Sequence, residues 1–166
     1  ISQTIPDYQS GLEASAILLE EGDGMALSQV GAGAYDDNGG ASGLSATLTK
    51  DSGTTVGDIA LVLLSWYPGS VSVSSFSGFT AAVSKQDDNG SSVQLYYRVI
   101  DGTEGSSFSL TFDGYVYHDA ILMTVRGSSA LAFISATSAS YTSGVTASAP
   151  SVSGSAGNGL VCAFGN

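Results

Sequence analysis

The chain has 166 residues and carries 15 acidic against 4 basic side chains, for a formal net charge of -11. This length suits one well-filled domain. Such a negative surface repels phosphate backbones and anionic lipids, and no stretch reaches transmembrane length, so we expect neither nucleic acid nor a membrane as a partner. The lone Cys162 excludes an intrachain disulfide.

The first segment, residues 1–25, has two interpretations. Ser10 and Glu13 have the spacing of a capping box, and Gly22 is placed to end a helix over residues 14–20. The alternative interpretation is a β-hairpin, which we favour slightly. Either form predicts an N-terminal element that covers the sheet or reaches a neighbouring subunit.

The hairpin alternative pairs residues 17–20 with residues 25–30. The turn between them is the glycine-rich sequence of residues 21–24. In both interpretations the segment forms an arm that precedes the main domain. We therefore expect a β-sandwich domain over residues 26–166, which we expect to continue beyond Asn166.

Three nearly continuous apolar runs predict buried β-strands, at residues 59–64, 120–125 and 160–164. Each run is too short for a membrane span and is flanked by Gly, Ser and Thr. A half-exposed strand alternates apolar and polar residues, whereas these runs do not alternate. We therefore expect both faces of these strands to be covered, either by another segment of the chain or by a neighbouring subunit.

Further strands are predicted from alternation and turn chemistry. Residues 81–86 and 92–99 form a predicted hairpin around Asn89-Gly90, because Asn-Gly supplies the positive φ angles of a tight turn. We expect the face of Val93, Leu95, Tyr97 and Val99 to be the core face. Phe108, Leu110 and Phe112 alternate with polar residues in another half-exposed strand. Additional strands are expected near 44–49, 71–75, 131–138 and 145–149.

Two Asp-Asp-Asn-Gly sequences, at residues 36–39 and 87–90, are compatible with calcium ligation or with ordinary turns. Neither has the alternating acidic positions and distal Glu of an EF-hand, so turn chemistry is the preferred interpretation. A calcium ion bound between Asp23, Asp36 or Asp58 stays an open alternative. No other cofactor is expected.

No catalytic constellation is evident from the sequence. His118 is the only histidine, and no serine lies in a Gly-x-Ser-x-Gly elbow, so we expect a packed or solvent-facing histidine and no enzyme. Zinc sites need several His or Cys ligands. The candidate ligand-binding residues are aromatic, since such rings stack on sugars, although they more often fill a core. These candidates are Trp66, Tyr67, Tyr115 and Tyr117.

The order of these strands resembles a β-sandwich, jelly-roll-like module of tailed-bacteriophage virion proteins and bacterial surface proteins. The resemblance covers about residues 27–165, and Phe79 stands where the module usually has Trp. The segments that carry it are Val56–Ser65, Phe76–Thr80, Leu95–Val99, Phe108–Phe112, Ala120–Gly127, Thr146–Val152 and Asn158–Gly165.

This resemblance implies an all-β, antiparallel fold and a non-enzymatic role on a virion, as a fibre, capsid decoration or tail-associated protein. Its implied partners are other virion proteins and further copies of the chain, by analogy as a trimer. The alternative is a carbohydrate-binding or adhesin module of a bacterial surface or phage receptor-binding protein, which is extracellular or at the cell surface and meets a glycan.

Overall fold

The computed structural model describes residues 13–20, 27–38, 40–83, 86–88, 90–127 and 132–140, and these residues contain strands and no helix. The all-β prediction is confirmed. The strands are β1 (Glu13–Glu20), β2 (Ser28–Asp37), β3 (Gly43–Thr49), β4 (Ile59–Tyr67), β5 (Val73–Phe76), β6 (Thr80–Ala81), β7 (Gln86–Asp88), β8 (Ser91–Val99), β9 (Ser107–Arg126) and β10 (Ala132–Ser140).

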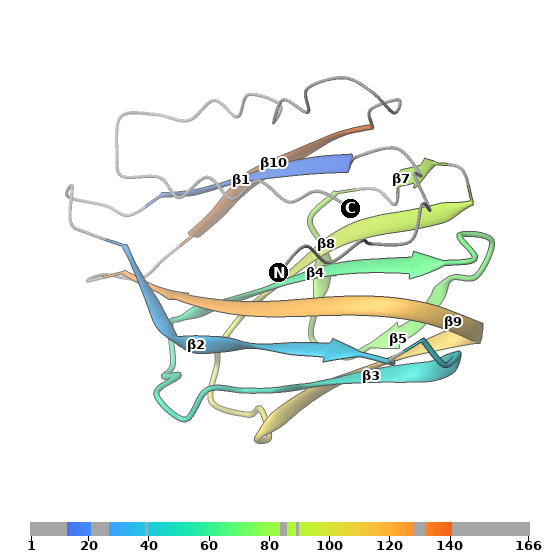
Figure 1. Ribbon diagram of the computed structural model, residues 1–166. Coiled ribbons are helices and arrows are strands. Elements are labelled where there is room, and N and C mark those ends of the chain that lie inside the picture. The colour runs from blue at the N-terminus through green and yellow to red at the C-terminus, as the bar shows by residue number, and fades with distance from the viewer. Residues whose placement is uncertain are drawn as a thin grey trace, which may run out of the picture.

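The 20-residue strand β9 organises the fold, because its two halves belong to two different layers (Figure 1). Its first half pairs with β3 on one side and β5 on the other, which forms the minor sheet. Its second half pairs with β2 and β4, and β4 pairs with β8. With the short β6 and β7, these strands form the principal sheet. All pairings are antiparallel, as predicted.

The main core lies between the two sheets. Phe108, Leu110 and Phe112 of the minor sheet are buried, while the residues between them are exposed, so the predicted alternation is confirmed. They form one cluster with inward-facing residues of the principal sheet, among them Val62 and Leu122. The strands therefore pack as a sandwich-like pair of layers, with apolar side chains between them.

Strand β4 is buried on both faces, as its continuous apolar sequence predicts. Ala60, Val62 and Leu64 face the main core. The intervening Ile59 and Leu61 belong to a second cluster on the other side, which we call the outer face of the principal sheet. A strand covered on both faces has no need of polar alternation.

The outer face has two different ends. Its covered end consists of Ile59, Leu61, Leu95 and Val125, each 2% exposed or less. Its open end consists of Tyr67, Tyr117, Asp119 and Ile121, and Ile121 is 40% exposed. The expectation that the run 120–125 is covered on both faces is therefore wrong at Ile121.

The covered end is covered by the chain itself. Leu27, Ala82 and Val83 are partly buried and pack against this cluster. The β1–β10 pair lies beyond β8 in Figure 1, and β10 contacts β7. The two-sided burial of β4 therefore needs no neighbouring subunit.

The pairing of β1 corrects the prediction for the N-terminal segment. Residues 13–20 form a strand, so the helix alternative is wrong. The favoured hairpin partner is also wrong: β1 pairs with β10, from Glu13 opposite Ser140 to Glu20 opposite Ala132, and β2 pairs with β9. A contact between segments so far apart in the sequence has no local turn signal.

Strand β8 corrects a second prediction. The hairpin of β7 and β8 is confirmed, and Gly90 has the expected positive φ of 87°. However, the expected core face, which includes Leu95 and Tyr97, lies on the outer face, while Tyr96 packs in the main core. Burial raises the pKa of Tyr96 to about 12. Both faces of β8 are thus packed, which its alternating sequence did not indicate.

An ion pair between the buried Asp58 and the partly exposed Arg126 lies at the covered end. The Arg126 guanidinium makes two contacts with the Asp58 carboxylate, Nε to Oδ1 at 2.8 Å and Nη2 to Oδ2 at 2.7 Å. Burial alone would raise the pKa of Asp58, but the bonds from Arg126 and the Thr55 N–H lower it below its usual range. The pair joins the segment before β4 to the end of β9.

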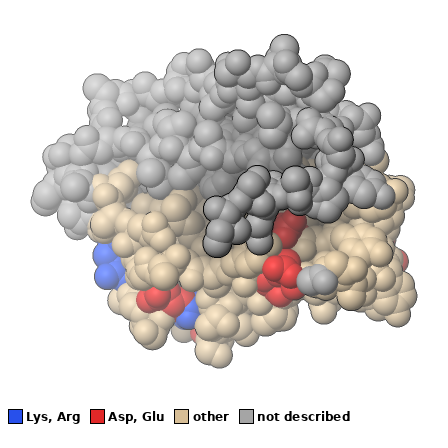
Figure 2. All heavy atoms as spheres, in the orientation of Figure 1, with Lys and Arg blue, Asp and Glu red and all other residues tan. Residues whose placement is uncertain are grey.

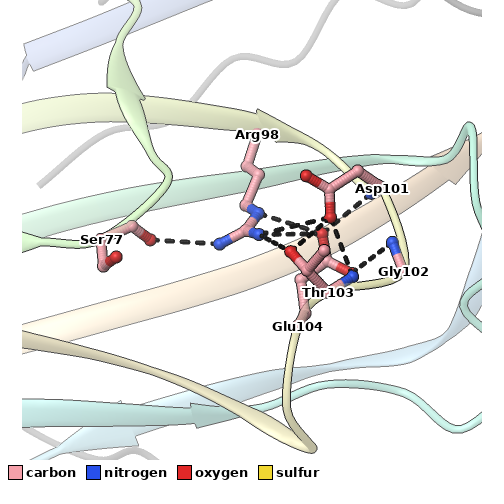
Figure 3. Close-up of polar contacts among 6 residues, drawn as sticks. All are labelled: Ser77, Arg98, Asp101, Gly102, Thr103 and Glu104. Carbon is pink, nitrogen blue, oxygen red and sulfur yellow. Dashed lines mark hydrogen bonds and ion pairs between the residues drawn. The ribbon is translucent and has the colours of Figure 1, made fainter.

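A second carboxylate organises the loop after β8 (Figure 3). The fully buried Glu104 accepts hydrogen bonds from the Arg98 side chain and from the main-chain N–H groups of Asp101 and Gly102. Burial opposes ionisation of Glu104, but these donors lower its pKa below the usual range. Arg98 also donates to the Ser77 carbonyl, so one side chain connects two loops.

The predicted strands near 145–149 and 160–164 lie outside the described residues.

Candidate functional site

A cleft of about 300 Å³ lies at the open end of the outer face. The end of β4, the start of β8, the middle of β9 and the turn after β2 meet around it. Sheet register brings the three strand segments together, and side-chain bonds from Asn38 to β9 hold the turn after β2 beside them. The residues that line the cleft are Asp37, Asn38, Gly40, Ser65, Trp66, Tyr67, Ser91, Tyr117, His118 and Asp119.

Two exposed tyrosines stand opposite each other at this cleft. Tyr67 of β4 and Tyr117 of β9 are directly paired in the register. Their exposed fractions are 53% and 48%. Because directly opposed residues on antiparallel strands have neighbouring Cβ atoms, the two rings share one side of the sheet. They give the cleft an aromatic wall.

Trp66 positions Tyr67 and is not itself available at the surface. Its indole is buried, with Nε1 donating to the Val71 carbonyl at 2.8 Å and the ring centroid 6.0 Å from that of Phe112. Successive strand residues point to opposite faces. Anchoring Trp66 inward therefore directs Tyr67 outward.

The turn after β4 is docked on the turn before β8. The Gly69 N–H donates to the Gly90 carbonyl, and the Ser92 hydroxyl donates to the Gly69 carbonyl at 3.2 Å. A Cβ on Gly69 would lie 2.5 Å from the Ser92 oxygen, so only glycine fits this approach. The Tyr67 ring lies beside Gly90. One side of the Tyr67 ring thus rests against the turn before β8.

Two carboxylates face each other on the other side of the cleft. Asp37 of β2 is directly opposite Asp119 of β9. The Tyr35 hydroxyl donates to Asp119 Oδ1 at 2.5 Å and also bonds to Asp37. The hydrogen bond to Asp119, together with burial and the negative charge of both carboxylates, raises the pKa of Tyr35 well above its usual value. Tyr35 therefore stays a neutral donor that stabilises two like charges in register.

Asn38 fixes the turn that closes this side. Its amide donates to the Val116 carbonyl at 2.5 Å, and its side-chain oxygen accepts from the His118 N–H at 3.1 Å. Both ends of the amide are thus used on the main chain of β9. The turn continues with the Ala41 N–H bonded to the Asn38 carbonyl at 2.9 Å.

His118 packs in the core, one of its two predicted locations. Its side chain is 2% exposed, its ring centroid lies 5.7 Å from that of Phe112, and Nε2 is 3.8 Å from Asp36 Oδ2. Neither ring nitrogen has a hydrogen-bond partner. A ring enclosed in this way has no access to an external substrate.

Of the acidic residues considered for calcium, Asp36 and Asp58 have other partners. Asp36 accepts a hydrogen bond from the Thr47 N–H at 2.5 Å, Asp58 is bound by Arg126, and Asp23 lies outside the described residues. Within the described part of the chain, no group of three or more His, Cys, Asp or Glu residues is arranged to hold a metal ion.

Three of the four aromatic candidates line the cleft: Trp66, Tyr67 and Tyr117. Tyr115 is strongly exposed but is not part of the lining. Sequence reasoning missed the role of Asp37 and Asp119 beside the rings. A signal was present, since Tyr-x-Asp occurs at residues 35–37 and again at 117–119, and this spacing places both side chains on one face of a strand.

No helix among the described residues is long and apolar enough to cross a membrane. No protein-family model matches the chain, and neither a curated protein sequence nor a solved structure matches it.

Proposed function

We propose that the protein is a non-enzymatic structural component of a bacteriophage virion, in a jelly-roll-like module of a fibre, decoration or tail-associated protein, and that it acts through contacts between its copies. The sandwich-like fold and the enclosed sole histidine support this role. The observation that carries the proposal is an uncharged face on a strongly acidic chain.

The outer face of the minor sheet supplies this uncharged surface, which we call the hydroxyl face. Its hydroxyl-bearing side chains are exposed. The exposed Asp113, two residues after Thr111 on β9, is the ionisable side chain that bounds this surface. Two cross-strand pairs of hydroxyls are within hydrogen-bond distance, at 3.2 Å and 3.0 Å. The hydroxyl face consists of Ser45, Thr47, Thr49, Ser74, Ser107, Ser109 and Thr111.

Charge explains why this face suits a second copy. Copies that each carry -11 repel one another, and an interface that includes opposed carboxylates adds to this cost. Charged side chains gather in small groups on the surface visible in Figure 2, and most of the described surface there has none. Contact through the hydroxyl face keeps the opposed carboxylates of the cleft out of the interface and presents hydroxyls, which can both donate and accept, to the second copy.

Sedimentation velocity tests the contact. We expect association that increases with protein concentration and with salt, because salt screens the repulsion between copies. Ser109→Asp, at the centre of the hydroxyl face, is expected to abolish association. Val56→Asp is the matched control: it adds the same charge at a strongly exposed position away from this face, and association is expected to persist.

Mass spectrometry of purified particles tests the virion assignment. The proposal expects the chain among the particle proteins in many copies. Its absence from particles, or a monomer at every concentration and salt tested, would overturn the proposal.

A further inference from the structure

We infer that the cleft between Tyr67, Tyr117 and the Asp37–Asp119 pair is a binding site for an uncharged saccharide. This inference goes beyond the assembly role and does not depend on it, because the cleft lies on the outer face of the principal sheet, whereas the hydroxyl face belongs to the minor sheet. The ligand class is the one considered for the candidate aromatic residues in the sequence.

The tyrosine pair provides the apolar half of the recognition. A sugar ring has an apolar C–H face, and an aromatic side chain provides a flat, amphipathic surface for it. Tyr67 and Tyr117 are directly opposed and about half exposed. Because the Tyr67 ring already lies against Gly90, part of its side-chain freedom is restricted before a ligand binds.

The opposite wall provides hydrogen-bond acceptors. Asp37 and Asp119 contribute carboxylate oxygens, and Ser65, directly opposite Asp119 on β4, contributes a hydroxyl. The Asn38 amide nitrogen already donates to the Val116 carbonyl. The wall is therefore rich in acceptors and suits a ligand with several O–H donors, which is what a sugar offers.

The charge and the volume of the cleft restrict the class of saccharide that it can bind. Two opposed carboxylates on a chain of charge -11 repel sugars that carry carboxylate, sulfate or phosphate groups. The volume of about 300 Å³ lies at the lower limit for small-molecule sites. Together these features favour one or two uncharged rings.

Tyr35 is a positioning residue for this wall. Tyr35 belongs to β2 and is not part of the cleft lining. Its hydroxyl donates to Asp119 Oδ1 at 2.5 Å. Removing the hydroxyl in Tyr35→Phe leaves Asp119 unrestrained. We expect weaker saccharide binding in this variant with the preference among sugars unchanged.

Saturation-transfer NMR with the full chain tests the site. The probes are the methyl glycosides of glucose, galactose, mannose and N-acetylglucosamine, compared with N-acetylneuraminic acid as an anionic sugar and choline as an organic cation. We expect at least one neutral glycoside to bind with a Kd on the order of 1 mM. Tyr67→Ala and Tyr117→Ala should each weaken it about tenfold.

Tyr115→Ala is the matched control, since Tyr115 is an exposed tyrosine of the same strand outside the cleft, and its binding should equal that of the wild type. Circular dichroism checks that each variant is folded, and Asp119→Asn gives a second variant that keeps both rings. Absence of neutral binding, a preference for the anion or for choline, loss of binding with EDTA, or equal losses in all three tyrosine variants would overturn the inference.

Discussion

The two ends of the outer face are built from the same strands but are used differently. At the covered end, Ile59 and Leu61 of β4 are enclosed by other parts of the chain. At the open end, Tyr67 of the same strand and its neighbour Tyr117 are about half exposed. One strand therefore stabilises the fold where other segments pack on it and offers side chains for contact where none do.

The largest expected effect on stability is the loss of an aliphatic side chain at the covered end, compared with the same change at the open end. Leu61→Ala removes a buried side chain at the covered end and should lower the free energy of unfolding by about 2–5 kcal/mol. Ile121→Ala is the matched control on the same face, and because Ile121 is 40% exposed its cost should be no more than about 1 kcal/mol. Urea denaturation measures both. Equal costs would show that the two ends do not differ.

The next effect concerns the ion pair at the covered end. Asp58→Asn should lower the free energy of unfolding by about 2 kcal/mol at pH 7. The buried side chain at position 58 then carries no charge to pair with Arg126. Since the pKa of Asp58 is lowered in the folded state, its contribution is complete above the unfolded pKa of about 4. It is lost as the pH falls through the folded pKa.

Urea denaturation at several pH values checks this dependence. The difference between wild type and Asp58→Asn should be constant from about pH 5 to pH 7 and should narrow below about pH 4. A difference that is unchanged in acid would mean that the charge of Asp58 does not contribute.

A smaller effect on stability is expected for two carboxylates in the loop after β8, one enclosed and one exposed. Glu104 has a side-chain exposure of 0%, whereas Asp101 is 61% exposed, and both carboxylates contact Arg98. Glu104→Gln should cost about 1–2 kcal/mol, because it removes the charge that strengthens the bonds from the Arg98 guanidinium and from two main-chain N–H groups. Asp101→Asn should cost clearly less, because water screens its contact. Thermal unfolding of the two variants measures the difference, and a larger loss for Asp101→Asn would contradict it.

The strands were largely predictable because their signals are local. The continuous apolar run of β4 and the alternation from Phe108 to Phe112 each indicate a strand without knowledge of its neighbours. The extent of covering was not predictable. Ile121 and Leu122 are equally apolar in the sequence, and only the packing of distant segments leaves the first exposed and the second buried.

The cleft, too, could be predicted from the sequence only in part. Tyr67 and Tyr117 were recognisable from the sequence as candidate ligand-binding aromatic residues, but their exposure and their proximity depend on the packing of the sheet and on the register between β4 and β9. The opposition of Asp37 and Asp119 depends in turn on the register between β2 and β9. Register is set by the whole buried face and not by any single residue. The Tyr-x-Asp spacing therefore indicates a ring and a carboxylate on one face of a strand, but it does not indicate which strands lie side by side.

Hydroxyl-radical footprinting of the folded chain, mapped by mass spectrometry, tests the central claim most directly. The structure predicts rapid oxidation of Tyr67, Tyr115 and Tyr117, and slow oxidation of the buried Trp66 and Tyr96. Rapid oxidation of Trp66, or protection of Tyr67 and Tyr117 in the isolated protein, would contradict the assignment of an open end to the principal sheet.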